Sequence, residues 1–134
     1  YEDLKTLGIE IAILNAKENL KDHYSYALLL KLSEVLISEE RIDESVELLK
    51  TVSYKKTVKI EEVVIVSMIA DLLNEYGHSE RSLKLYHNLI FRHKLPRKLE
   101  IKLLNSALLI SNEVNDRKMF EKITNRLNHF HIGG

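Results

Sequence analysis

The chain has 134 residues, of which 45% are hydrophobic and 30% are charged, and it contains no cysteine. This apolar content excludes a disordered protein, and the absence of cysteine excludes disulfides and cysteine-ligated metal sites. The 20 basic and 20 acidic residues cancel, so no overall field attracts the chain to a nucleic acid or a membrane surface. Four glycines and one proline favour an all-α fold of long helices and short turns.

A repeat with a period of 37 residues organises the chain. Small residues recur at Ser33, Ala70 and Ala107, and a second small set recurs at Gly8, Ser45 and Ser82 until Met119 interrupts it. Large apolar residues keep the same spacing in three rows: Leu29, Val66 and Leu103; Leu36, Leu73 and Ile110; Leu49, Tyr86 and Ile123. Such a fixed period is typical of repeat arrays, in which each unit buries its apolar face against its neighbours.

The first predicted element is an orphan helix over residues 1–21. A shift of 37 aligns Gly8, Ile9, Ile11 and Ala12 with Ser45, Val46, Leu48 and Leu49, the second helix of a unit. We expect either a chain cut within a repeat, which we favour, or an N-terminal capping helix. The end formed by residues 1–20 should then expose apolar surface and promote self-association.

Three helix pairs follow, in a repeat over residues 23–53, a repeat over 60–93 and a degenerate repeat over 97–131. With the orphan helix they make about seven helices in a single domain. Gly77 is expected to end a helix through a positive φ, and Ser79 to cap the next one. Pro96 suits the first position of the fifth paired helix, and Asp116 should cap the sixth.

The middle unit resembles a tetratricopeptide repeat. The matching positions of the three units, in chain order, are Leu29, Leu32, Ser33, Leu36, Glu40, Ser45, Leu49 and Val52; Val66, Ile69, Ala70, Leu73, Gly77, Ser82, Tyr86 and Leu89; and Leu103, Ser106, Ala107, Ile110, Val114, Met119, Ile123 and Arg126. The family's unit is about 34 residues long, so this array is a divergent one. The resemblance implies a right-handed α-solenoid of antiparallel helix pairs.

The resemblance also implies a binding groove on the concave face, which is lined by the first helix of each unit. The residues expected to line it are Leu30, Glu34, Ile37, Ser67, Asp71, Asn74, Ile101, Asn105 and Leu108. Some family members grip a partner's terminal carboxylate with Lys, Asn and Arg. Here Leu30, Glu34 and Asn105 occupy those positions, so we expect no such clamp. Glu34 and Asp71 instead favour a basic or amide-rich ligand, although both could equally belong to an ordinary solvated surface.

The two connections between units are basic. Their cationic residues are Lys55, Lys56, Lys59, Arg92, Lys94, Arg97 and Lys98. The period maps Lys55 onto Arg92, which predicts that both connections lie on one edge, where they could meet phosphate or an acidic partner. Cations near helix C-termini also occur because they compensate the helix dipole. No interleaved aromatic residue suggests base stacking, which makes nucleic acid an unfavoured partner.

No motif for catalysis is present, and we expect no enzyme activity. The six histidines lack the spacing of three or four that helical metal ligands need, so neither a metal site nor a cofactor is expected. The sequence therefore predicts a protein–protein interaction module or scaffold that binds a peptide or partner helix. The alternatives are the sensory peptide-binding domain of a transcriptional regulator and a scaffold subunit with a basic edge that contacts nucleic acid. No apolar run reaches the roughly 18 residues of a membrane span, and we expect a cytoplasmic location.

Overall fold

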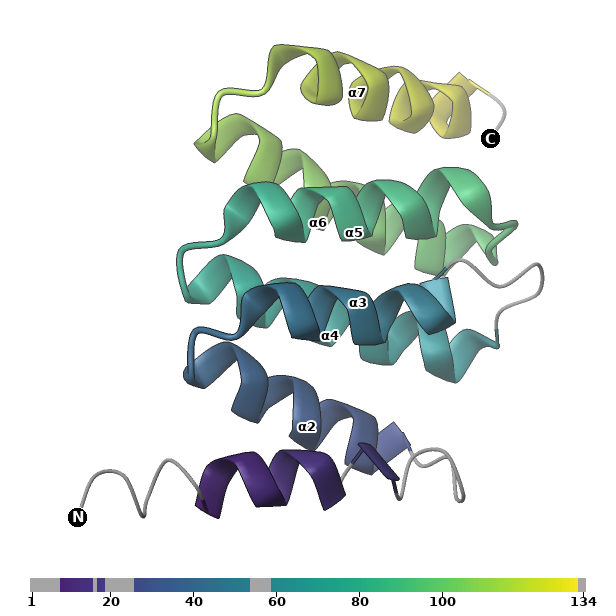
Figure 1. The fold of residues 1–134 in the computed structure, drawn as a ribbon. Helices are drawn as coiled ribbons and strands as arrows, with labels where there is room; N and C mark the ends of the chain where they lie inside the picture. The colour runs from purple at the N-terminus through teal and green to yellow at the C-terminus, as the bar shows by residue number, and fades with distance from the viewer. Residues whose placement is uncertain (1–7, 16, 19–25, 54–58, 133–134) are drawn as a thin grey trace.

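The computed structural model describes residues 8–15, 17–18, 26–53 and 59–132, with only the backbone for 51–53 and 131–132. Helices and short turns account for these residues, as expected for an all-α fold (Figure 1). After a helical segment over residues 8–15, the helices are α2 (Tyr26–Ser38), α3 (Ile42–Ser53), α4 (Ile60–Glu75), α5 (Ser79–Arg92), α6 (Arg97–Glu113) and α7 (Arg117–Ile132). Lys55 and Lys56 lie outside the described residues.

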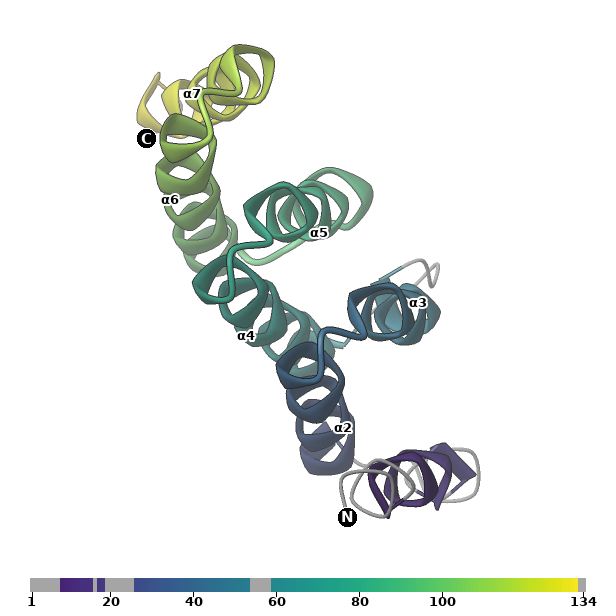
Figure 2. The same ribbon diagram turned by 60° about the vertical axis from the view of Figure 1, so that its left-hand side comes forward.

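The helices stack in two layers. Helices α2, α4 and α6 follow one another in the first layer, and α3 and α5 lie on one side of it (Figure 2). Within each pair the helices pack together, as α2 with α3, α4 with α5 and α6 with α7. Successive pairs are joined by packing of α2 on α4 and of α5 on α6. Segment 8–15 and α7 therefore lie at opposite ends of the stack (Figure 1).

The turns within the three pairs share one backbone geometry. Each has a residue with positive φ just after the first helix: Glu40 at 59°, Gly77 at 88° and Asn115 at 59°. In each turn the next amide donates to a carbonyl five residues earlier, as from His78 to Leu73 at 2.8 Å. This pattern is a Schellman motif, which satisfies the last carbonyls of the first helix. Gly77 thus has the positive φ that the sequence predicts.

The third unit differs in length from the predicted period. The left-handed residue moves by 37 positions from Glu40 to Gly77 but by 38 from Gly77 to Asn115. The prediction that Val114 occupies the turn position is therefore wrong by one residue. Helix α6 has 17 residues against 16 in α4, so one extra residue lies between Ala107 and the turn, and α7 begins 38 residues after α5 begins.

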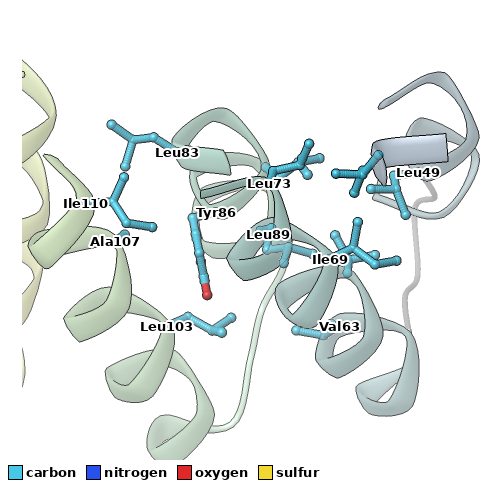
Figure 3. Close-up of a cluster of buried hydrophobic side chains, with 14 of the residues drawn as sticks. Leu49, Val63, Ile69, Leu73, Leu83, Tyr86, Leu89, Leu103, Ala107 and Ile110 are labelled. Carbon is cyan, nitrogen blue, oxygen red and sulfur yellow. The ribbon is translucent and has the colours of Figure 1, made fainter. Parts of the chain in front are cut away.

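Five of the six predicted small residues lie in the core, whereas Gly8 is exposed. Ser33, Ser45, Ser82, Ala70 and Ala107 are buried, with exposed fractions of 0–1%. Large apolar side chains from α4, α5 and α6 pack around Tyr86 and Leu89 (Figure 3). Small side chains in such a core let helix backbones approach closely. The 37-residue period therefore marks positions of close helix contact as well as buried positions.

Two predicted helix starts are wrong by one residue. Helix α5 begins at Ser79 with His78 as its N-cap, and the Ser79 hydroxyl donates to Asn74 Oδ1 at 2.6 Å instead of capping the helix. Pro96 is the N-cap of α6 and not its first residue. Asp116 does cap α7, because its Oδ1 accepts a hydrogen bond from the Met119 amide at 3.1 Å.

The predicted register of the N-terminal helix is also wrong. Ala12 is exposed although its counterpart Leu49 is buried, and Ile13 is buried in its place. Arg41 bonds both Glu10, at 2.6 Å, and Glu44, and Lys17 lies 3.4 Å from Glu44. These ion pairs hold segment 8–15 against the start of α3 in an orientation that the 37-residue shift does not reproduce.

Candidate functional site

The predicted groove residues occupy the outer side of the first-layer helices, with one exception. Glu34, Asp71 and Asn105 are exposed. Five others are half-buried: Leu30, Ser67, Asn74, Ile101 and Leu108. Ile37 is fully buried and lines no open surface. Helix α2 packs against both α3 and α4, so its buried stripe is wide enough to include Ile37.

Besides Ile60 at its start, helix α4 has two exposed apolar side chains that the sequence analysis missed. Val64 is 39% exposed and Met68 is 46% exposed, on the same stripe as Asp71. The period could have found them, because Ile101 and Asn105 lie 37 residues after Val64 and Met68. We call Glu34, Val64, Met68, Asp71 and Asn105 the first-helix face.

Tyr86 connects the buried core to this face. Its ring is buried between side chains of α4 and α6 (Figure 3), and its hydroxyl donates a hydrogen bond to Asp71 Oδ1. The Ser67 carbonyl is 3.4 Å from the same hydroxyl oxygen. Burial, and next the bond to Asp71, raise the pKa of Tyr86, so it remains a proton donor at physiological pH. An aromatic residue at a core position thus holds an exposed carboxylate in place.

The described members of the basic edge are exposed and lie where consecutive pairs meet. They are Lys59, Arg92, Lys94, Arg97 and Lys98. Arg92 ends α5, where a cation compensates the helix dipole. Lys59 precedes α4 and Lys98 is in the first turn of α6, where the dipole disfavours a cation. Dipole compensation therefore does not explain the whole edge.

Arg97 has a structural role within this edge. Its guanidinium donates to the Phe130 carbonyl at 3.2 Å and lies 5.8 Å from the centre of the Phe130 ring. This contact attaches the start of α6 to the end of α7. Lys59, Lys94 and Lys98 are accordingly the better candidates for contacting a partner.

Clefts are also present between the second helices of successive pairs. A cleft of about 400 Å³ between α3 and α5 is lined by Val46, Lys50, Arg81, Lys84, Leu85 and Asn88. Arg81 is already paired with Asp43 at 2.5 Å, and Lys50 with Glu47 at 3.1 Å. No predicted groove residue lines this cleft, so the first-helix face is an open surface separate from it.

Other classes of site find little support in the described part of the chain. Among its side chains, no three His, Cys, Asp or Glu residues converge in a way that would hold a metal ion. Within the same ranges, every helix is too short or too polar to span a bilayer.

The chain matches no protein-family model, and comparisons with curated proteins and with solved structures also found no match. The geometry of the site is therefore the basis for assigning a function.

Proposed function

We propose that the chain is a divergent tetratricopeptide-like α-solenoid that binds a segment of another protein on its first-helix face. The observation that carries this proposal is the exposure of Val64 and Met68 on a helix whose opposite side is packed in the core. Neighbouring large apolar side chains that are exposed to water are energetically unfavourable. An apolar side chain of a partner would bury them and remove this cost.

The charge of the face specifies the partner further. Glu34 and Asp71 are exposed on neighbouring helices, 37 residues apart, and α2 packs on α4. A ligand with an apolar side chain flanked by lysine or arginine complements this arrangement. The mechanism is recognition by a preorganised surface and involves no chemical step.

Site-specific photo-crosslinking tests this function in the cells that produce the protein. A benzophenone side chain placed at Met68 should yield a discrete adduct with another protein, and excess unmodified chain should compete it away. The same group at Lys84, on α5 in the other layer, is the matched control. Equal adducts from both positions, or none from Met68, would contradict the proposal.

A variant should then separate binding from folding. Met68→Asp places a charge on a half-exposed position, so the chain should stay folded, with only the small loss of stability that the lower helix propensity of Asp brings. With the benzophenone group placed at Val64 of this variant, the yield of the adduct with the partner should fall by about tenfold or more. An unchanged yield would mean that the apolar pair is not the anchor.

The basic edge supports a second candidate function, a scaffold that contacts an acidic polymer such as nucleic acid. Lys59 and Lys98 are placed against the local helix dipole, which favours a role outside the fold. Binding to a labelled single-stranded oligonucleotide should weaken steeply as salt rises, and Lys94→Glu with Lys98→Glu should abolish it. Binding that is flat between low and moderate salt would contradict this function.

A further inference from the structure

We propose that Asp71, oriented by the buried hydroxyl of Tyr86, is the point at which the first-helix face recognises an arginine or lysine of the bound segment. This inference rests on the proposed function and specifies the chemistry of its ligand. A carboxylate that is fixed before binding loses less freedom when a cation pairs with it than a mobile surface carboxylate does.

The geometry leaves Asp71 available to a partner. Tyr86 bonds one carboxylate oxygen, Oδ1, so the second oxygen can accept a hydrogen bond from outside. In the ranges that the structure describes, Asp71 has no ion pair with a Lys, Arg or His side chain. Most surface carboxylates rotate freely, whereas this one is held from below by a side chain that is itself only 1% exposed.

The surroundings favour a basic residue next to an apolar one. Met68 lies one helical turn before Asp71, and Glu34 occupies the equivalent position on α2. A segment that places an apolar side chain on Val64 and Met68 would bring its next residues within reach of these two carboxylates. An apolar contact next to an ion pair excludes part of the surrounding water. The attraction between the two charges is then stronger than in an isolated surface ion pair.

A pair of synthetic amphipathic peptides tests the inference directly. One contains leucine and arginine, and the other replaces every arginine with citrulline, which has nearly the same shape and no charge. Each is titrated into isotope-labelled protein while the backbone amide signals are followed by NMR. The arginine peptide should shift signals of α4 around Asp71 and bind roughly three- to tenfold more tightly than the citrulline peptide.

Three variants locate the preference. Asp71→Asn should remove the preference for arginine, and Tyr86→Phe should reduce it, with both chains still folded by their thermal unfolding. Glu75→Gln removes the same charge from the same stripe, at a carboxylate that has no hydrogen bond among the described residues, and should reduce the preference less than Tyr86→Phe does. Glu121→Gln, on α7, controls for net charge.

The outcomes separate this inference from the proposed function. If both peptides shift the α4 signals equally, the face binds apolar segments and the role of Asp71 is wrong. If Tyr86→Phe keeps the full preference, orientation by the hydroxyl is wrong. If Glu75→Gln matches Asp71→Asn, the preference comes from the general acidic field and the inference is overturned. If neither peptide shifts α4, the binding face itself is contradicted.

Discussion

At the scale of single residues, the buried serines explain why the period is visible at all. Ser33, Ser45 and Ser82 are fully buried, and their hydroxyls have no hydrogen-bond partner in the described part of the chain. An unpaired buried hydroxyl costs roughly 1–3 kcal/mol relative to a paired one. These positions therefore favour small size over hydrogen bonding, as expected where helices approach closely.

Substitution at Ser82 tests this explanation. Ser82→Ala should raise the free energy of unfolding by about 1 kcal/mol, because it removes the unpaired hydroxyl and improves helix propensity. Ser82→Val, which adds volume at the same place, should lower it by about 1–3 kcal/mol through overpacking. Urea unfolding of the two variants measures both. A loss of stability in Ser82→Ala would show that the hydroxyl has a partner after all.

The candidate site shows what residue patterns can and cannot predict. Asp71 and Asn105 were placed on the groove by the tetratricopeptide resemblance, and the structure shows that both side chains are exposed. The contact between Tyr86 and Asp71 was not predicted, since it depends on how deeply α5 packs between α4 and α6. Ile37 was misplaced for a similar reason, because the width of a buried stripe depends on the number of neighbouring helices.

At the scale of elements, the three turns place three different residue types at the same left-handed backbone position, so their effects can be compared. Gly77 adopts φ 88° without strain, whereas Glu40 has a Cβ and holds φ 59°. Asn115 tolerates this region better than most residues with a side chain. A Cβ added at Gly77 would meet no atom within 4 Å, so a substitution there causes no clash and acts through the backbone conformation.

The turns should therefore respond in a fixed order. Gly77→Ala should lower the free energy of unfolding by about 1 kcal/mol, and Glu40→Gly should raise it by roughly 0.5–1 kcal/mol. Asn115→Gly should have a smaller effect than Glu40→Gly. The expected gain in stability for Glu40→Gly already allows for the loss of the exposed contact between Glu40 and His78, whose side chains are 3.2 Å apart. Thermal unfolding ranks the three, and stabilisation by Gly77→Ala would contradict the turn geometry.

A titratable contact joins α5 to α7. Lys122 Nζ lies 2.7 Å from His87 Nε2 and 4.3 Å from the centre of the Phe91 ring. Burial, and next the Lys122 charge, lower the pKa of His87, so the neutral imidazole accepts a hydrogen bond from the ammonium in the folded protein. Protonation of His87 would remove that acceptor and place two cations together.

This contact predicts a loss of stability in mild acid. An unfolded histidine takes up a proton at a pH near 6.5, above the pKa of folded His87, so the unfolded state binds more protons as the pH falls through this range. The free energy of unfolding should therefore fall between about pH 7 and pH 5. His87→Gln should flatten this slope. A slope that persists in His87→Gln would contradict the prediction.

Element boundaries were largely predictable because turns and caps have local causes. Gly77 and Asp116 act as expected, since a positive φ and a side-chain oxygen are properties of single residues. The extra residue in α6 was not predictable, because Ile110 before it and Ile123 after it both keep the 37-residue spacing. The predicted register of segment 8–15 was wrong since the ion pair of Glu10 with Arg41, and not the apolar repeat alone, contributes to its orientation.

At the scale of the whole molecule, a net charge of zero conceals a separation of charge. The turns within pairs lie at one end of the helices, and the connection between α5 and α6 lies at the other (Figure 1). Exposed acidic residues outnumber exposed cations at the first end, where Glu39, Glu40, Asp43, Glu75, Glu80, Glu113 and Asp116 lie with Arg81, Arg117 and Lys118. The exposed cations of the basic edge occupy the second. Composition alone therefore understates the field at each edge, which orients the molecule toward charged partners.

The two ends of the stack also differ, and this difference predicts self-association. Segment 8–15 exposes Ile11 (51%) and Leu14 (59%) on its outer side, with Gly8, Ala12 and Asn15 between and beside them and no charge among the five. Helix α7 instead exposes polar and charged residues, as a capping helix does: Lys118, Glu121, Lys122, Asn125, Arg126 and Asn128. An uncharged apolar face complements a second copy of itself better than it complements the polar α7.

Sedimentation velocity over a wide concentration range should thus detect a weak dimer whose formation involves the N-terminal face. Leu14→Glu should shift the equilibrium to monomer, because two copies would bring like charges together in a small apolar contact. Leu109→Glu, at a residue of α6 that is 67% exposed, is the matched control and should leave the dimer unchanged. High salt should preserve the dimer, since its stability comes from apolar burial, whereas an association through the charged edges would dissolve. A dimer that persists in Leu14→Glu and dissociates in high salt would show that the dimer contact lies at the charged edges. A chain that stays strictly monomeric at high concentration would contradict self-association through the N-terminal face.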